Sequence, residues 1–201
     1  MISKFPVGTE TWFIDSSSMI TLAHYRPLRG LVVGFLQPRK IIHVSSVAQE
    51  LKRLSEDHPN NIYFNAAVRD QAWLGAPQEH LHLVDEIFDI RDDLAVGTSF
   101  SHPLEHLGES HIIAAGVHVA GDVFVVADDH NARVLAKERG LHPMSIIRLM
   151  HEMVLLGLLT PEKAAEHANE LKRLGRAVKK YEAANFLDGK LGRIGEPDII
   201  Y

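Results

Sequence analysis

Two short apolar runs in this chain each lead into an acidic turn and then into a helix-forming segment. The run at residues 11–14, Thr-Trp-Phe-Ile, precedes Asp15, and the run at residues 123–126, Val-Phe-Val-Val, is followed closely by Asp128 and Asp129. Short continuous apolar runs are typical of strands buried on both faces, and strands that alternate with helices build a parallel sheet covered by helices. The sequence therefore predicts an α/β fold with acidic turns beyond the carboxyl ends of strands, where such sheets form their sites.

Other patterns extend this alternation along the chain. Residues 40–44 and 81–84 are predicted to be strands, and residues 107–119 to be a helix with Ile112 and Ile113 facing inward. Residues 31–36 and 62–73 fit either a helix or a strand, while residues 89–103 fit a loop or a short helix. About the last sixty residues are helical in character, with a helix over residues 144–158, another from Pro161, and a loosely held tail from Asn185.

Composition limits the class of protein. There is no apolar run near ~18 residues, so no transmembrane span is expected, and the amino terminus lacks the apolar stretch of a secretory signal. The absence of cysteine excludes disulfides and thiolate metal sites, and it suits a cytoplasmic protein. The formal net charge of −5 argues against a generic nucleic-acid binder. That argument is weaker for a nuclease, because its catalytic acids count as negative charges that bound metal offsets.

Four carboxylates are candidates for a functional site. Asp15, Glu50, Glu109 and Asp129 each stand where a strand or helix is predicted to end or turn, framed by apolar residues. Hard divalent cations such as Mg²⁺ and Mn²⁺ bind oxygen ligands, and acids from distant segments are how a fold builds such a site. Each acid also fits a simpler role: Asp15 and Asp129 as helix N-caps, Glu109 near a helix start, and Glu50 on a solvated helix face. The residues themselves leave both interpretations open.

The order of these acids and their neighbours resembles the motif set of the PIN-domain nucleases, over about residues 12–175. The glycine-leucine turn at residues 140–141 and the helix pair after it are similar to a subgroup of that family. The four matching segments are Phe13-Ile14-Asp15-Ser16-Ser17, Val47-Ala48-Gln49-Glu50-Leu51, His106-Leu107-Gly108-Glu109-Ser110 and Val125-Val126-Ala127-Asp128-Asp129.

The resemblance implies a three-layer α/β domain over residues 1–160, with a mostly parallel sheet flanked by helices, and a helical extension over residues 161–201. It implies a Mg²⁺- or Mn²⁺-dependent ribonuclease that cleaves single-stranded RNA. Family members are often toxins of bacterial toxin–antitoxin pairs, are commonly homodimers, and are held inactive by a small antitoxin protein. The positions that carry over are Asp15, Glu50, Glu109 and Asp129 as metal-binding catalytic acids, Asp128 as substitute or assistant for Asp129, and Ser17 beside the first acid.

Basic residues are candidates for contact with RNA at three places, of which one is the early set Arg26, Arg29, Arg39 and Lys40. Arg133 follows the fourth acid on one predicted helix and is the first choice for a substrate phosphate, together with Ser17, against an ordinary salt bridge to a nearby acid. A basic stripe late in the chain is either a contact surface or a solvated helix face. The stripe consists of Lys172, Arg173, Arg176, Lys179 and Lys180.

Two other function classes also fit parts of the chain. One is a PIN-like module that binds RNA or a protein with weak or no catalysis. It is favoured by the acidic net charge and by Ala127, which stands where the family often has a hydroxyl residue two positions before the fourth acid. The other is a Mg²⁺-dependent phosphatase of the haloacid dehalogenase type. That class expects Asp-x-Asp at the first strand, and Asp15-Ser16-Ser17 lacks the second acid.

Zinc chemistry is a further alternative, because the chain has thirteen histidines. His80 and His82 form a spaced pair, and His106 and His111 flank Glu109. Neither spacing matches the His-Glu-x-x-His pattern or its inverse. Scattered surface histidines are therefore the favoured interpretation.

Overall fold

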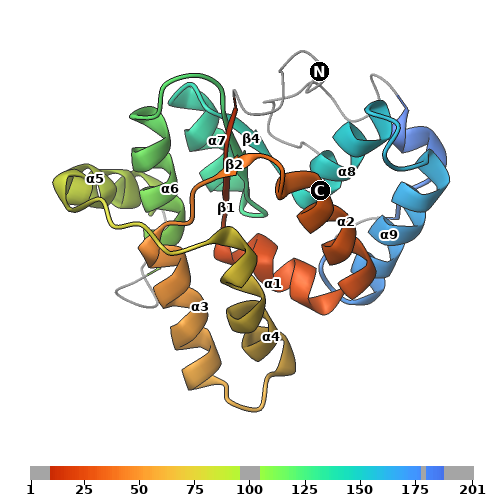
Figure 1. The fold of residues 1–201 in the computed structure, drawn as a ribbon, viewed down its shortest axis with the longest axis horizontal. Helices are drawn as coiled ribbons and strands as arrows, with labels where there is room; N and C mark the ends of the chain where they lie inside the picture. The colour runs from red at the N-terminus through yellow and green to blue at the C-terminus, as the bar shows by residue number, and fades with distance from the viewer. Residues whose placement is uncertain (1–9, 96–104, 178–179, 188–201) are drawn as a thin grey trace.

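A computed structural model describes residues 10–95, 105–177 and 180–187 of the 201-residue chain. Its sheet has four strands in the order β2-β1-β3-β4, and the neighbouring strands are parallel. The strands are β1 (Thr11–Ile14), β2 (Lys40–Ile41), β3 (Val123–Val126) and β4 (His142–Met144). Helices lie on both sides of this sheet (Figure 1), so the predicted α/β fold class is confirmed.

Nine α-helices surround the sheet within the described residues. Figure 1 shows α5, α6 and α7 on one side of it and α2, α8 and α9 on the other. The helices are α1 (Ser16–His24), α2 (Arg26–Leu36), α3 (Ser45–Asp57), α4 (Ile62–Asp70), α5 (Val84–Leu94), α6 (Leu107–Val117), α7 (His130–Glu138), α8 (Ile146–Leu155) and α9 (Pro161–Arg173). In the described ranges, three short 3₁₀ helices accompany them: η2 (Gln71–Leu74), η3 (Leu81–Leu83) and η4 (Ala183–Phe186). The two segments that fitted either a helix or a strand are both helical, residues 31–36 in α2 and residues 62–73 in α4 and η2.

The core is centred on Trp12 of β1, which is fully buried. Its ring stacks on Phe124 of β3 with centroids 4.5 Å apart, and it meets the ring of Phe35 of α2 edge-on at 5.7 Å. Aromatic pairs of this kind contribute about 0.5–1.5 kcal/mol beyond the area that they bury. Helix α6 is buried along residues 108–116, and this stretch includes the polar residues Glu109, Ser110 and His111. The strands and the helix that carry the acids are therefore anchored in the core.

The strand predicted at residues 81–84 is wrong. Leu81–Leu83 form η3, and Val84 begins α5. The residues that become buried, Leu83, Ile87 and Ile90, recur at helical spacing, whereas Leu81 is 76% exposed. A short alternating run does not separate the two periodicities, and the helical pattern of the following residues decides. Helix α5 also covers the first part of the segment 89–103, and residues 96–104 lie outside the described residues.

Two predictions at the edges of the sheet also need correction. Strand β2 stops at Ile41, and Val44 instead makes an isolated bridge with Gln78. The carboxyl-terminal segment is not all helical, because His142–Met144 form the edge strand β4 beside β3. Pro143 is tolerated there because an edge strand leaves one side of its backbone without a ladder partner.

The carboxyl-terminal extension packs on the rest of the chain. Helix α9 begins at Pro161 after the N-cap Thr160, as predicted, and it contacts α8 and η4. Phe186 of η4 is fully buried, so the tail is held beyond Asn185, where it was expected to loosen. Residues 188–201 lie outside the described residues, and the domain division at residue 160 stays a prediction. None of the helices in the described ranges is both long and apolar enough to cross a membrane.

Candidate active site at the carboxyl edge of the sheet

The acidic site lies where β1 and β3 end side by side. Ile14 pairs with Val126 in the parallel register, so the residues after each strand emerge at the same edge of the sheet. The backbone N–H of Asp15 donates to the carbonyl oxygen of Val126 at 3.0 Å. Asp15 therefore lies beside the loop that carries Asp128 and Asp129.

Asp15 is the most buried acid of this site. It is the N-cap of α1, and its Oδ1 accepts a hydrogen bond from the backbone N–H of Ser18 at 2.7 Å. Its side chain is fully buried, and its Oδ2 has no hydrogen-bond partner among the described residues. The capping role and a role in the site are therefore compatible, because each uses a different oxygen.

Glu50 and Glu109 reach the same place from two helices that pack together. Ser16 donates its hydroxyl to Glu50 Oε2 at 2.8 Å, which ties α3 to the start of α1. A Cβ on Gly108 would lie 2.9 Å from that same oxygen, so the missing side chain lets α6 approach Glu50. Glu109 is 9% exposed, and its Oε2 has no hydrogen-bond partner in the described part of the chain. Acids from two helices and two strand ends therefore lie at one edge of the sheet.

Burial, together with repulsion from neighbouring acids, raises the pKa of Asp15 and Glu109. Burial, followed by the negative charges of Asp128 and Glu50, raises the pKa of Asp15 to about 7. Burial, followed by the charges of Asp15, Glu50 and Asp129, raises the pKa of Glu109 to about 8. Burial also raises the pKa of Glu50, against the lowering effect of its hydrogen bond from a serine hydroxyl. Without a cation, this cluster therefore holds protons near neutral pH.

Asp128 and Asp129 have different surroundings. Asp129 is the N-cap of α7, and its Oδ1 accepts a backbone N–H at 2.8 Å. Asp128 turns toward α1, where its Oδ2 accepts a hydrogen bond from the Thr21 hydroxyl at 2.7 Å. Among the charges that act on Asp15, that of Asp128 has the largest effect. Asp128 is thus the loop acid with the larger effect on Asp15, whereas Asp129 caps α7 and affects Glu109.

Arg133 is buried in the wall of the site. It is 2% exposed, and its Nη1 donates to the carbonyl oxygens of Ala127 at 2.8 Å and of Asp128 at 2.7 Å. The guanidinium therefore orients the loop that carries Asp128, which differs from the phosphate contact predicted from the sequence. Ser17, the other predicted phosphate contact, is half-buried, and its carbonyl oxygen accepts a hydrogen bond from Arg176 at 3.2 Å.

The carboxylate oxygens of the site are the type of ligand that hard divalent cations prefer, but the side chains do not converge on one point. Within the described ranges, no three His, Asp or Glu side chains lie close enough to hold a metal ion together. Yet two buried carboxylate oxygens, Asp15 Oδ2 and Glu109 Oε2, have no partner among the described residues. Buried carboxylates of this kind are satisfied by protons or by a cation, and all-oxygen donors select Mg²⁺ or Mn²⁺ over softer metals. Asp15 Oδ2 and Glu109 Oε2 are therefore the candidate donor oxygens for such an ion.

Three residues that contact the acids, directly or through a hydroxyl, were not assigned to the site from the sequence. Ser16 and Thr21 donate hydroxyls to Glu50 and Asp128, and Arg176 donates to Thr21 Oγ1 at 2.8 Å from Nη2 and at 3.1 Å from Nε. From the sequence, the hydroxyl residues that follow Asp15 indicated only the start of a helix. Apart from its membership of the basic stripe, nothing in the sequence placed Arg176 at the site, because Arg176 and Thr21 are 155 positions apart.

A second polar cluster lies between α3, η3 and α6. The Ser46 hydroxyl lies 2.8 Å from His111 Nδ1, and His111 Nε2 lies 2.9 Å from His80 Nδ1. These residues line a pocket of about 200 Å³ together with the apolar side chains of Leu81 and Phe88. Burial, with a smaller effect of His80, lowers the pKa of His111 to about 4. The separation between His80 and His111 matches no zinc motif, so this contact could not be predicted from the sequence.

Comparisons with protein-family models, with curated proteins and with solved structures found no match. The assignment of a function therefore depends on the geometry of the acidic site and on the resemblance of its four motifs.

Proposed function

We propose that this protein is a Mg²⁺- or Mn²⁺-dependent endoribonuclease that hydrolyses phosphodiester bonds of single-stranded RNA. The observation that carries the proposal is the pair of buried carboxylate oxygens, Asp15 Oδ2 and Glu109 Oε2, that lack partners among the described residues. Burial of an unpaired ionised carboxylate costs roughly several kcal/mol, and a bound divalent cation offsets that cost.

Asp15, Glu50, Glu109 and Asp128 are the residues that would hold the ion, with Asp129 at the border. When bound, such an ion lowers the pKa of a coordinated water and neutralises charge on the phosphoryl oxygens. The hydroxyl contacts from α1 keep Glu50 and Asp128 in fixed orientations. Glu109, whose pKa is about 8, must lose its proton before it can act as a ligand, so binding of the ion is favoured at higher pH.

A toxin role, an antitoxin partner and a homodimer are proposals that rest on the motif resemblance alone. An inhibitor of such a site would have to cover the carboxyl edge of the sheet, where Asp15 and the loop after β3 meet. Co-expression with the product of a small neighbouring reading frame would test the toxin role directly: relief of growth inhibition supports it, and a chain that does not inhibit growth contradicts it.

Thermal melting in Mn²⁺ and in EDTA tests the metal site first. We expect Mn²⁺ to raise the Tm of the wild type, because a ligand at 100 times its Kd stabilises the folded state by about 2.7 kcal/mol. The double variant Asp15→Asn/Asp129→Asn should not respond, since it loses two of the site's negative charges while both asparagines still cap their helices. Asp57→Asn, at the exposed end of α3, is the matched control and should respond like the wild type.

Cleavage of a fluorogenic single-stranded RNA oligonucleotide in Mn²⁺ then tests the activity. The proposal expects cleavage by the wild type and by Asp57→Asn, and none by a folded Asp15→Asn variant. A wild type whose Tm rises in Mn²⁺ but which leaves single-stranded RNA intact would show a metal site without this activity.

The second candidate is a PIN-like module that binds RNA or a protein with weak or no catalysis. Two observations favour it: Ala127 replaces the hydroxyl residue that the family often has, and no three ligands converge among the described residues. This candidate expects an RNA affinity that is equal in Mn²⁺ and EDTA, with no cleavage in either. The melting experiment separates the two candidates, because a binding module does not need to respond to metal.

A further inference from the structure

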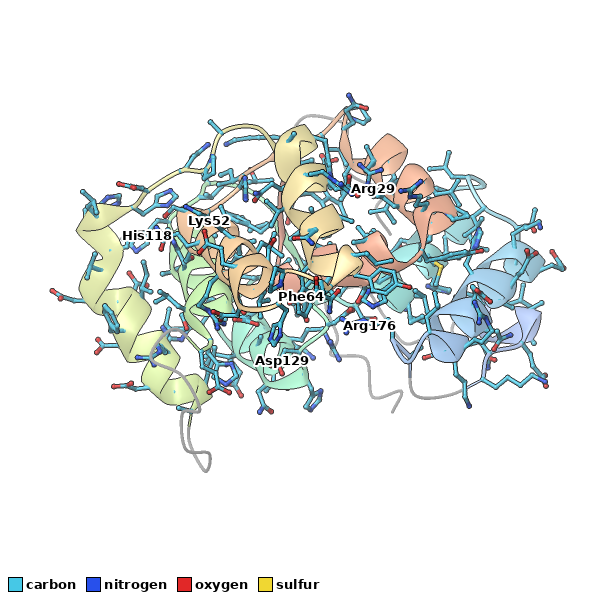
Figure 2. All side chains as sticks on the ribbon, turned by 90° about the horizontal axis from the view of Figure 1, so that it is seen from below. Arg29, Lys52, Phe64, His118, Asp129 and Arg176 are labelled. Atoms are coloured by element: carbon cyan, nitrogen blue, oxygen red, sulfur yellow. The ribbon has the colours of Figure 1, made fainter. Side chains whose placement is uncertain are left out.

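The carboxyl-terminal extension brings a cationic group to the acidic site. After α9 the chain turns at Gly175, which has a φ of +72°, and the next residue, Arg176, reaches back to α1. Its Nη2 donates to the Thr21 hydroxyl oxygen at 2.8 Å and to the Ser17 carbonyl oxygen at 3.2 Å. Figure 2 shows Arg176 and Asp129 on the same side of the molecule, away from Arg29.

The Thr21 hydroxyl connects this guanidinium with the acids. It accepts hydrogen bonds from Arg176 Nη2 and Nε, and it donates to Asp128 Oδ2 at 2.7 Å. Asp128 in turn has the largest effect among the charges that raise the pKa of Asp15. The guanidinium therefore lies one hydroxyl group away from the acids that we assign to the ion.

The surroundings of Arg176 differ from those of the neighbouring arginines. Arg173, one turn earlier, is 70% exposed and forms an ion pair with Glu170 at 2.6 Å. Arg133 is buried and bonded to backbone carbonyls. Arg176 is half-buried, its Nε and Nη2 donate to α1, and its Nη1 makes no hydrogen bond with a described residue. One edge of a positioned guanidinium is therefore left for a ligand.

We propose that Arg176 binds a phosphate of the RNA strand that enters the acidic site, so that the extension supplies the phosphate contact that the sequence assigned to Arg133. This inference rests on the proposed ribonuclease function. A planar guanidinium matches the geometry of phosphate oxygens and keeps its charge at any physiological pH. The contacts with Thr21 and Ser17 hold the side chain in place before RNA arrives, which reduces the conformational entropy lost on binding.

A contact between Arg176 and phosphate matters because the acids of the site repel RNA. The site contains five acids, and the whole chain has a formal net charge of −5. A phosphodiester strand therefore approaches against the field of the protein unless a local cation offsets it. A positive group beside the acids, without a carboxylate ion pair among the described residues, is placed to do so.

The test measures RNA affinity as a function of salt. Fluorescence anisotropy of a labelled single-stranded oligonucleotide in Ca²⁺ gives Kd at several KCl concentrations, and gel analysis of the recovered RNA confirms that it stays intact. Loss of one phosphate contact on a single strand lowers the slope of log K against log salt by about 0.7. Arg176→Gln removes the charge but can still donate a hydrogen bond to Thr21, so it separates the charge of the guanidinium from its contact with α1.

We expect Arg176→Gln to weaken RNA binding by about five- to tenfold and to lower the salt slope by about 0.7. Arg173→Gln, on the same stripe, should leave both unchanged. Arg176→Lys keeps the charge and loses the forked contact with α1, so its salt slope should match the wild type, with affinity within about threefold. If Arg176→Gln does not fold, modification of the folded wild type with phenylglyoxal decides: bound RNA should protect Arg176 from the reagent and leave Arg173 reactive, and equal modification of Arg176 with and without RNA would contradict the phosphate contact.

Three results would overturn the inference. A lower Tm for Arg176→Gln, with wild-type affinity and salt slope, would assign Arg176 a purely structural contact and leave the ribonuclease proposal standing. Equal losses in Arg173→Gln and Arg176→Gln would indicate a diffuse basic surface. A wild type that neither binds nor cleaves single-stranded RNA would overturn the proposed function, and this inference with it.

Discussion

Replacement of Asp15 by asparagine should stabilise the metal-free protein at pH 8, although it alters a buried and hydrogen-bonded side chain. Asparagine is as good an N-cap as aspartate, so the bond from the Ser18 N–H is retained. The amide is neutral, so the burial and the repulsion from Asp128 and Glu50 that oppose the ionised carboxylate no longer act. The variant therefore removes an unfavourable charge while it keeps the favourable contact.

The magnitude follows from the shift in pKa. The pKa of Asp15 rises from 3.8 to about 7, and each unit corresponds to about 1.36 kcal/mol, so the ionised carboxylate costs the folded state about 4 kcal/mol at pH 8. Because the folded pKa is the higher one, this cost is absent below pH 3.8 and accumulates as the pH rises to about 7. At pH 4.5 it has fallen to about 1 kcal/mol. The new amide also needs a partner for its NH₂ group, so we expect a net gain of about 2–4 kcal/mol at pH 8.

Urea denaturation in EDTA, at pH 8 and at pH 4.5, measures this gain. In a chain of this length, about 2–4 kcal/mol corresponds to a Tm increase of roughly 4–16 °C. Asp57→Asn, whose side chain in the wild type is 53% exposed, should change stability by less than about 0.5 kcal/mol at either pH. An Asp15→Asn variant that is no more stable than the wild type at pH 8 would refute the argument that Asp15 is a buried, repelled acid.

Three further predictions concern the same region. Gly108→Ala should weaken the Tm response to Mn²⁺, because the added Cβ would lie 2.9 Å from Glu50 Oε2 and displace that carboxylate. Binding of Mn²⁺ should release more protons at pH 7 than at pH 9, because Glu109 has a pKa of about 8; calorimetry in buffers of different ionisation enthalpy measures the difference. Ser46→Ala should destabilise the protein by about 1–2 kcal/mol in urea denaturation, because it removes the hydrogen-bond partner of His111 Nδ1.

Each of these predictions has a control or a contradicting result. Gly34→Ala, where a new Cβ meets open space on α2, should gain up to about 1 kcal/mol and keep the full response to Mn²⁺. Equal proton release at pH 7 and pH 9 would contradict the raised pKa of Glu109. A Ser46→Ala variant as stable as the wild type would show that the contact with His111 contributes nothing to stability.

Elements with a strong local signal were predicted well. The buried runs of β1 and β3 and the Thr160-Pro161 start of α9 depend on neighbouring residues, so they are visible in the sequence. The prediction failed where the local signal is short or mixed. Strand β4 has three residues, one of them proline, and it exists because β3 offers a free edge. The alternation at residues 81–84 gave way to the helical spacing of the longer segment that follows.

The candidate site divides in the same way. The position of Asp15 after β1, and of Asp128 and Asp129 after β3, could be predicted from the sequence, as could the capping of the helices that follow. The sequence did not show that Arg133 is bonded to the backbone of the acidic loop, or that Gly108 of α6 lies against the Glu50 carboxylate. Those contacts depend on how segments that are distant in the sequence pack against one another.

The sequence by itself determined a parallel α/β architecture and the acids at its carboxyl edge, because burial periodicity and helix caps are encoded within a few residues. The tertiary structure alone decided which groups share the site. The bond from Ser16 to Glu50 joins residues 34 positions apart, and that from Arg176 to Thr21 joins residues 155 apart. The raised pKa values of Asp15 and Glu109 arise from burial and from the summed charges of several segments. Electrostatic interaction depends on distance in space and on local dielectric, and neither can be read from spacing along the chain.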